Sequence, residues 1–161
     1  MGIRKHLMFG TLQRYNRFTN VKFTIMPTIH SSYLGNLRTE QQHLASGQKF
    51  ITDAPIDNQG KGEAISPTDS VCAALSACMM TLMGIAANTH SINLEGFQAD
   101  VTKHMASDPR RIMAIDIRFY GFSAELTEKQ QIILERAART CPVAMSLHPD
   151  LEQNIVFEFG A

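Results

Sequence analysis

The feature that most constrains the fold is an apolar segment, residues 71–87, that follows a strong helix-start signal. Ser66 can cap a helix, Pro67 suits the first helical position, and Asp69 favours the positive end of the helix dipole. The apolar residues that follow leave no clean polar face, which is typical of a helix buried on all sides. We therefore predict a buried helix from Pro67 to about Ala87.

The pattern around this helix predicts an α+β domain, because strands and helices come in groups rather than in strict alternation. Residues 28–53 read as strands with a turn at Ser46-Gly47, followed by a loop to Gly62. Asp108-Pro109 supplies the turn of a second hairpin. The elements expected after residue 90 are strands over 97–105 and 112–122, helices over 128–140 and 142–147, and a strand over 155–159.

Charge separates the first 25 residues from the rest of the chain. Residues 1–25 hold five Arg and Lys and no acid, whereas the other 136 hold ten Arg and Lys against fifteen Asp and Glu, a net charge of −5. We interpret residues 1–25 as a basic extension: a disordered tail, upstream sequence before a true start at Met26, a targeting peptide, or a basic arm for nucleic acid or membrane. The body, 26–161, is one domain, and its acidity argues against a nucleic-acid partner.

No uninterrupted apolar run reaches the ~18 residues that span a bilayer, since Ser76, Thr81 and Gly84 break the longest one. Three cysteines are also too few, and odd in number, for a secreted disulfide scaffold. Both observations predict a cytoplasmic protein without a membrane partner.

The cysteines are Cys72, Cys78 and Cys141. Six residues turn a helix by ~600°, so Cys72 and Cys78 face different directions and are a poor zinc pair. Cys141 precedes Pro142, and at a helix N-cap the dipole favours its thiolate; alternatively it only packs beneath the turn. Cys78, inside a buried helix, is either a core residue or a nucleophile that needs a cation nearby.

Several side chains could assist a reactive thiol. Candidate cations for Cys78 are Arg38, Arg110, Arg111 and the histidines. His148 lies seven residues after Cys141, so a Cys–His hydrolase pair is a further hypothesis. Four basic residues flank the second hairpin turn and are interpreted as a solvated end, with an anion site as the alternative: Lys103, His104, Arg110 and Arg111.

Two segments resemble the OsmC/Ohr family. Residues 66–78, Ser-Pro-Thr-Asp-Ser-Val-Cys-Ala-Ala-Leu-Ser-Ala-Cys, look like its central-helix motif, and Thr140-Cys141-Pro142-Val143 looks like its second cysteine motif. The resemblance extends from about residue 28 to the C-terminus. It implies the OsmC-like fold, with antiparallel sheets wrapped around a long buried central helix, in an intertwined homodimer whose active sites lie at the subunit interface.

The resemblance also implies a function. Cys78 would be the peroxidatic cysteine that reduces an organic or lipid hydroperoxide, and Cys141 would resolve its sulfenic acid into a disulfide. A dithiol reductant, of lipoyl type in one branch, would restore the thiols, with no metal or organic cofactor.

The family pattern is incomplete at one place. Its peroxidases carry a Glu ten residues before the reactive cysteine, which orients an Arg onto the thiolate, whereas this chain has Thr68 there. Arg38 is assigned as the arginine and the neighbouring Asp69 as its carboxylate, in a clamp that is either rebuilt or absent. The departure motivates an alternative, a non-enzymatic relative that binds a small apolar ligand or senses redox state.

Overall fold

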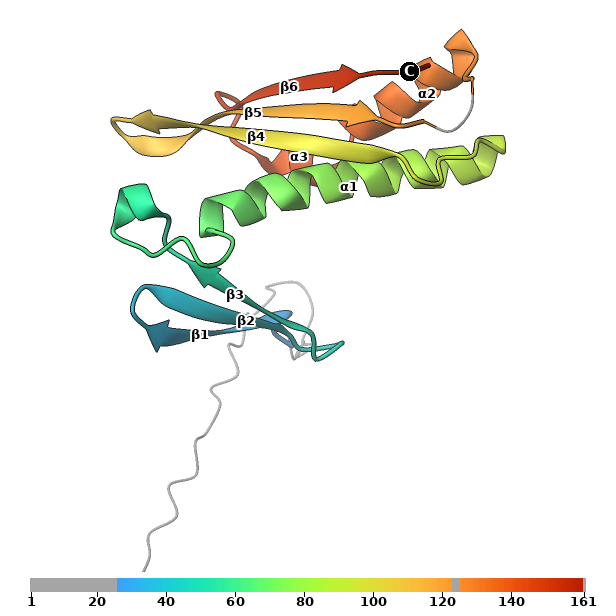
Figure 1. Cartoon of the computed structure of the whole chain (residues 1–161). Helices are drawn as coiled ribbons and strands as arrows, with labels where there is room; N and C mark the ends of the chain where they lie inside the picture. The colour runs from blue at the N-terminus through green and yellow to red at the C-terminus, as the bar shows by residue number, and fades with distance from the viewer. Residues whose placement is uncertain (1–25, 123–124, 161) are drawn as a thin grey trace, which may run out of the picture.

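The computed structural model describes residues 26–122 and 125–160, so the prediction of a separate extension over 1–25 lies outside it. The described chain forms two three-stranded sheets, a long helix and two shorter ones (Figure 1). The elements are β1 (Ile29–Gly35), β2 (Arg38–His43), β3 (Lys49–Asp53), a 3-10 turn (Ile56–Asn58), α1 (Pro67–His90), β4 (Gln98–Ser107), β5 (Arg110–Tyr120), α2 (Glu128–Arg139), α3 (Pro142–Ser146) and β6 (Glu152–Phe157). The predicted α+β class and element order are confirmed.

The N-terminal sheet, β1-β2-β3, is antiparallel and lies beside the start of α1, apart from the other sheet (Figure 1). Only Thr52 and Asp53 of this sheet are buried. Large apolar side chains such as Ile29, Phe50 and Ile51 stay between 43% and 49% exposed. This sheet therefore has almost no core of its own within one chain.

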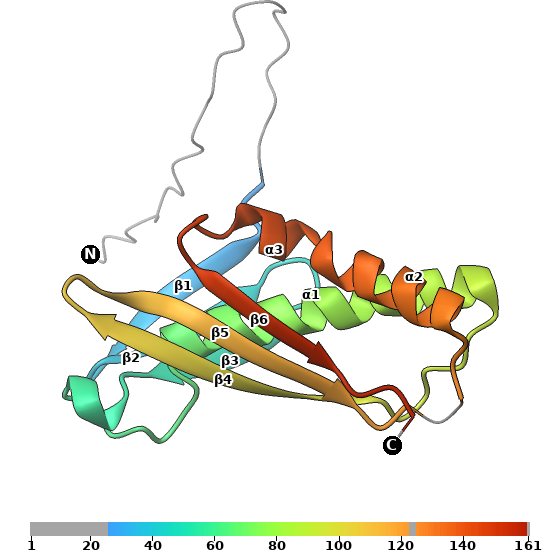
Figure 2. The ribbon, with the colours of Figure 1, turned by 90° about the horizontal axis from the view of Figure 1, so that it is seen from above.

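The C-terminal sheet has the order β4-β5-β6, and α1, α2 and α3 cover one of its faces (Figure 2). β4 and β5 are antiparallel, as predicted, but β6 runs parallel to β5, with Ile117 opposite Ile155. The expectation of purely antiparallel sheets is wrong here. Two helices connect β5 to β6, and such a long crossover allows the second strand to enter in the same direction.

Helix α1 begins as the sequence predicts. The Asp69 N–H donates to Ser66 Oγ at 3.1 Å, and the Ser66 N–H donates to Asp69 Oδ2 at 2.9 Å. This reciprocal pair is a capping box, which satisfies two backbone donors of the helix N-terminus. The helix continues to His90 and closes at Ser91, which adopts a left-handed conformation.

Only one face of α1 is buried, so the prediction of a helix covered on all sides is wrong for the single chain. Leu75, Met79 and Met83 are fully buried, while Ala77 and Ile85 are exposed. By length and mean hydropathy, α1 could also cross a membrane. This differs from our expectation that Ser76, Thr81 and Gly84 leave the apolar run too short to do so. The core helix of a soluble protein has the same properties, and the buried face of α1 packs against the protein's own sheet and helices.

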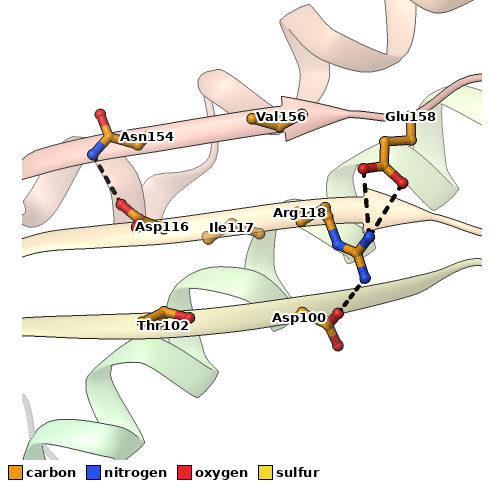
Figure 3. A pocket seen from close by; sticks show the side chains of 8 residues that line it. All are labelled: Asp100, Thr102, Asp116, Ile117, Arg118, Asn154, Val156 and Glu158. Carbon is orange, nitrogen blue, oxygen red and sulfur yellow. Dashed lines mark hydrogen bonds and ion pairs between the residues drawn. The ribbon is translucent and has the colours of Figure 1, made fainter.

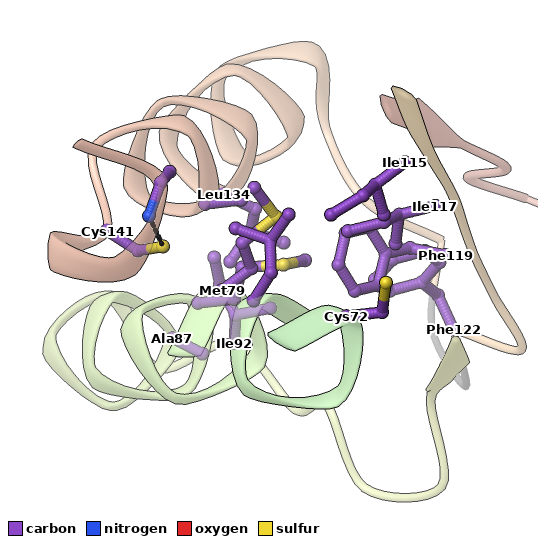
Figure 4. Close-up of a cluster of buried hydrophobic side chains, with 14 of the residues drawn as sticks. Cys72, Met79, Ala87, Ile92, Ile115, Ile117, Phe119, Phe122, Leu134 and Cys141 are labelled. Carbon is purple, nitrogen blue, oxygen red and sulfur yellow. Dashed lines mark hydrogen bonds between the residues drawn. The ribbon is translucent and has the colours of Figure 1, made fainter. Parts of the chain in front are cut away.

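The core lies between α1, α2 and the inner face of β5 (Figure 4). Ile115, Ile117 and Phe119 alternate along β5 with polar residues and point inward, as their period-two pattern predicts. Phe119 stacks on Phe157 with ring centroids 5.2 Å apart. This core fixes α1 and α3 relative to each other, which is what positions the two thiols described next.

Candidate functional site

Cys78 lies in the fourth turn of α1 and is half-buried. The side chains on either side of it in the helix, Ala77 and Met79, are exposed and fully buried respectively. Cys78 therefore sits at the border between the packed face and the open face of the helix. Such a thiol can be reached from outside while part of it contacts the interior.

Cys141 is the N-cap residue of α3, as predicted, and it is fully buried. The Ala144 N–H donates to its Sγ at 3.3 Å (Figure 4). Pro142 occupies the first helical position behind it. The sequence Cys-Pro thus builds a cap in which the sulfur takes the place of the usual oxygen acceptor.

Burial raises the pKa of the Cys141 thiol. The Ala144 N–H opposes this rise, and interaction with the Cys78 thiol adds to it. The expectation that the helix N-terminus would favour a Cys141 thiolate is therefore wrong, because desolvation outweighs the cap. Helix α1 packs against α3, so the free Cys78 and Cys141 thiols lie close enough to interact.

Cys72 is separate from this pair. It is 5% exposed and lies in the core, where Lys103 and Asp69 are the charged groups that act on its pKa. Burial raises its pKa, with a smaller lowering by the charge of Lys103. Among residues 26–122 and 125–160, no group of three or more His, Cys, Asp or Glu could hold a metal ion.

Arg38 opens strand β2 and bonds two carboxylates through its Nη2 atom. Asp53 Oδ2 lies 3.5 Å away, and Glu63 forms a closer ion pair. In the described chain neither Asp69 nor Cys78 contacts this guanidinium. The clamp assigned to Arg38 and Asp69 is thus not formed within one chain.

Asp69 has a different partner. The Lys103 ammonium, on β4, donates to Asp69 Oδ1 at 2.5 Å and to Thr68 Oγ1 at 2.8 Å. Burial tends to raise the pKa of Asp69, but hydrogen bonds from Lys103 and Ser66 outweigh it and lower the pKa. Lys103 is only 18% exposed, so our interpretation of it as part of a solvated end is wrong.

His148 does not pair with Cys141. Its side chain is 68% exposed, and its Nδ1 accepts the Asp150 N–H at 3.2 Å. Arg110 is bound to Asp57 at 2.9 Å, and Arg111 to the Ile112 carbonyl at 3.5 Å. Within the described residues, the Cys–His hydrolase hypothesis has no geometric support, and Arg110 pairs with Asp57 rather than with Cys78.

A hollow of about 690 Å³ lies on the outer face of the C-terminal sheet, and no cysteine lines it. Arg118 bridges Asp100 and Glu158 across it, and Asn154 donates to Asp116 (Figure 3). These charges satisfy one another. We interpret the hollow as a solvated surface on which charged side chains form a network of ion pairs.

A smaller pocket, about 270 Å³, lies between the N-terminal sheet and the start of α1. Its lining is mostly apolar and includes Ile29, Phe50 and Pro67. Residues of the N-terminal sheet and of α1 line it together.

The fold and the pair of thiols together define a class of protein. Its members are α+β domains with one cysteine on a long central helix and a second at the N-cap of a later helix. The family model for OsmC-like protein matches residues 60–155, more than half of the chain. The chain belongs to this family, and the resemblance seen in its sequence is confirmed.

Solved structures of other proteins have the same fold as this chain. A Psychrobacter arcticus protein named for osmotic stress induction and the detoxification response is 48% identical, with a TM-score of 0.81 over 84% of this chain and 98% of that chain. Organic hydroperoxide resistance proteins from Legionella pneumophila and Elizabethkingia anophelis are each 14% identical, with TM-scores of 0.66 and 0.63. They cover 83% and 86% of this chain and 98% and 100% of their own, and they share the fold. No curated protein matches the chain.

Sequence reasoning missed three residues of this region: Asp53, Glu63 and Lys103. Asp53 ends a strand immediately before a loop with a proline, a position that reads as turn chemistry. Glu63 is one of several polar residues in that loop. Only the folded loop reveals that both acids converge on Arg38.

Proposed function

We propose that this protein is a thiol peroxidase that reduces organic hydroperoxides, with Cys78 as the peroxidatic and Cys141 as the resolving cysteine. The observation that carries the proposal is the packing of α1 against α3, which lets a half-buried Cys78 interact with a buried, capped Cys141. Family membership supports it, since some structural relatives are named organic hydroperoxide resistance proteins.

The environments of the three thiols support this division of roles. Burial raises the pKa of Cys72 and of Cys141, so both are neutral thiols at pH 7. A thiolate is the nucleophile in peroxide reduction. Cys78 is the accessible thiol of the three, so it is the one assigned to the first step.

In the proposed reaction, the Cys78 thiolate attacks the outer oxygen of the hydroperoxide and the O–O bond breaks. The sulfur is oxidised to a sulfenic acid, and the alkoxide takes a proton and leaves as an alcohol. The Cys141 thiol then attacks the sulfenic sulfur, which forms the Cys78–Cys141 disulfide and releases water. A dithiol, of lipoyl type, reduces the disulfide by exchange, and the step involves no metal or organic cofactor.

The active unit is proposed to be an intertwined homodimer. Ala73, Ala77 and Ile85 leave an uncovered apolar stripe on α1, and the N-terminal sheet has almost no core in one chain. A second copy would bury both. It would also allow Arg38 of one copy to approach Cys78 of the other, where its charge would stabilise the thiolate.

The proposal is tested by the turnover of cumene hydroperoxide and of hydrogen peroxide, with dihydrolipoamide as reductant. We expect faster reduction of the organic peroxide, and loss of turnover in Cys141→Ser while Cys78 still becomes a sulfenic acid. Equal, slow consumption of both peroxides at the rate of a free thiol would contradict the proposal. Fractionation of the source cells tests the expected cytoplasmic location.

A second candidate is a non-enzymatic protein that binds a small apolar ligand or senses redox state. Thr68, in place of a Glu, and the apolar pocket of about 270 Å³ favour it. It predicts saturable binding of a fatty-acid probe that Phe50→Ala weakens, together with peroxide consumption no faster than that of a free thiol.

A further inference from the structure

We propose that Asp53 and Glu63 are positioning residues that hold Arg38 and replace the helix glutamate missing at Thr68. This inference rests on the proposed function, in which Arg38 stabilises the Cys78 thiolate. It places the carboxylate partner of the arginine on β3 and the following loop rather than on α1.

The first support is strand register. Arg38 and Asp53 are opposite each other in the antiparallel β2–β3 pair, so the backbone ladder sets their separation. Asp53 is fully buried, and its Oδ2 accepts the Glu63 N–H at 2.9 Å beside the Arg38 contact at 3.5 Å. The backbone hydrogen bond from Glu63 therefore holds the Asp53 carboxylate in place independently of the Arg38 guanidinium.

The second support is the charge state of Asp53. The Glu63 N–H, together with Arg38 and the Ala54 N–H, lowers its pKa against the opposing effect of burial. A buried carboxylate that stays ionised requires a cation, and Arg38 is its cation here. Asp53 Oδ1 accepts no hydrogen bond within the described part of the chain, so the carboxylate keeps room for another donor.

The third support is the loop that joins Asp53 to α1. The Gly62 N–H donates to the Ala54 carbonyl at 3.2 Å, and the Asp53 N–H to the Ile65 carbonyl at 3.1 Å, which closes the loop over Asp53. A Cβ atom at Gly60 would lie 1.7 Å from that Ala54 oxygen, so only glycine allows this approach. The closed loop presents both the backbone and the side chain of Glu63 to the same place.

Both carboxylates bind the same Arg38 nitrogen, Nη2. Within the described residues, Nη1 and Nε of Arg38 donate to nothing. A guanidinium held at one corner keeps its remaining N–H donors for a thiolate or a peroxide oxygen. On α1, by contrast, the side chains of Thr68 and Asp69 accept hydrogen bonds from the Lys103 ammonium.

The test measures Cys78 alone, in a Cys72→Ser/Cys141→Ser background, by its rate of alkylation with iodoacetamide against pH. Arg38→Met should move the midpoint to higher pH, and Glu63→Gln and Asp53→Asn should move it in the same direction. In the full chain, each acid variant should slow cumene hydroperoxide reduction by roughly 10- to 100-fold, the usual effect of a misplaced catalytic group. Glu63 is 54% exposed, so Glu63→Gln tests the clamp even if Asp53→Asn fails to fold.

Two controls separate positioning from a structural role. Asp57→Asn removes an acid–arginine pair of the same loop, that with Arg110, and should leave midpoint and rate unchanged. Glu63→Gln added to Arg38→Met should change the rate by less than about 2-fold, because its effect passes through Arg38. The inference would be overturned if both acid variants kept the wild-type midpoint and rate. It would also be overturned if Glu63→Gln slowed peroxide reduction in the Arg38→Met background as much as it does in the wild type. A shifted midpoint without fast peroxide reduction by the wild type would instead contradict the proposed function.

Discussion

The two parts of this chain differ in how much of their folding they complete alone. The C-terminal part, residues 67–157, surrounds a core in which Leu75, Phe119 and Leu134 are fully buried. The N-terminal sheet buries only Thr52 and Asp53 and leaves its large apolar side chains exposed. The C-terminal part therefore holds both thiols by itself, whereas the N-terminal sheet presents Arg38 and an apolar face that a second copy covers in the proposed dimer.

The sharpest contrast is in chemistry. Cys78→Ser should abolish organic hydroperoxide reduction, a loss of roughly 10³-fold or more, because it removes the proposed nucleophile. Arg38→Met should retain measurable activity, because in the proposed mechanism the arginine only stabilises the thiolate. Initial rates with cumene hydroperoxide check both variants, and equal losses in the two would erase the distinction between the parts.

The next contrast is in stability. Phe119→Ala should reduce the free energy of unfolding by about 3–5 kcal/mol, the usual cost of truncating a buried phenylalanine. Phe50→Ala should cost less than about 1 kcal/mol in the isolated chain, since Phe50 is 49% exposed. Urea unfolding at low protein concentration measures both. A cost of several kcal/mol for Phe50→Ala there would show that the N-terminal sheet has a core of its own.

A third prediction concerns the open face of α1. Ala77→Glu should be nearly neutral for a single chain, because Ala77 is exposed. In a dimer that buries this stripe, the unpaired charge should raise the dissociation constant by about 100-fold or more. Light scattering coupled to size-exclusion chromatography measures the mass. An unchanged dimer in the variant, or a monomeric wild type, would contradict the proposed assembly.

The smallest effect is expected at the link between β4 and α1. The pKa of Asp69 is lowered in the folded chain, so its ionised form stabilises the fold above its unfolded pKa, about 4. That stabilisation disappears as the pH falls through the lower folded pKa. Asp69→Asn should cost about 1 kcal/mol or less at pH 7, because the carboxylate is 45% exposed and screened.

Urea unfolding of wild type and Asp69→Asn at pH 7 and at pH 3 checks this sign. The difference between their free energies of unfolding should be smaller at pH 3 than at pH 7. A larger difference at pH 3 would mean that Lys103 does not stabilise the ionised form of Asp69.

Much of the fold was predictable because its signals are local. Ser66 and Pro67 fix the start of α1, Pro142 fixes the cap at Cys141, and period-two alternation marks β5. The direction of β6 was not predictable, since it depends on how α2 and α3 return the chain. The open face of α1 was also missed, because an apolar helix surface does not reveal whether its own chain or another copy covers it.

The candidate site was predictable only in part. The positions of Cys78 and Cys141 follow from helix motifs, but their contact depends on the packing of α1 against α3. The partner of Arg38 was missed because Asp53 and Glu63 meet through strand register and a closed loop, which sequence spacing does not encode. The exposure of Cys78 and the burial of Cys141 likewise emerge from packing.

The most direct test of the proposed thiol chemistry is peptide mass spectrometry of the reduced protein after brief exposure to one equivalent of cumene hydroperoxide, beside the same dose of hydrogen peroxide. We expect a loss of two hydrogens mapped to a Cys78–Cys141 link, formed faster with the organic peroxide, with Cys72 still a free thiol. Oxidation no faster than that of a free thiol, or a disulfide that includes Cys72, would contradict it.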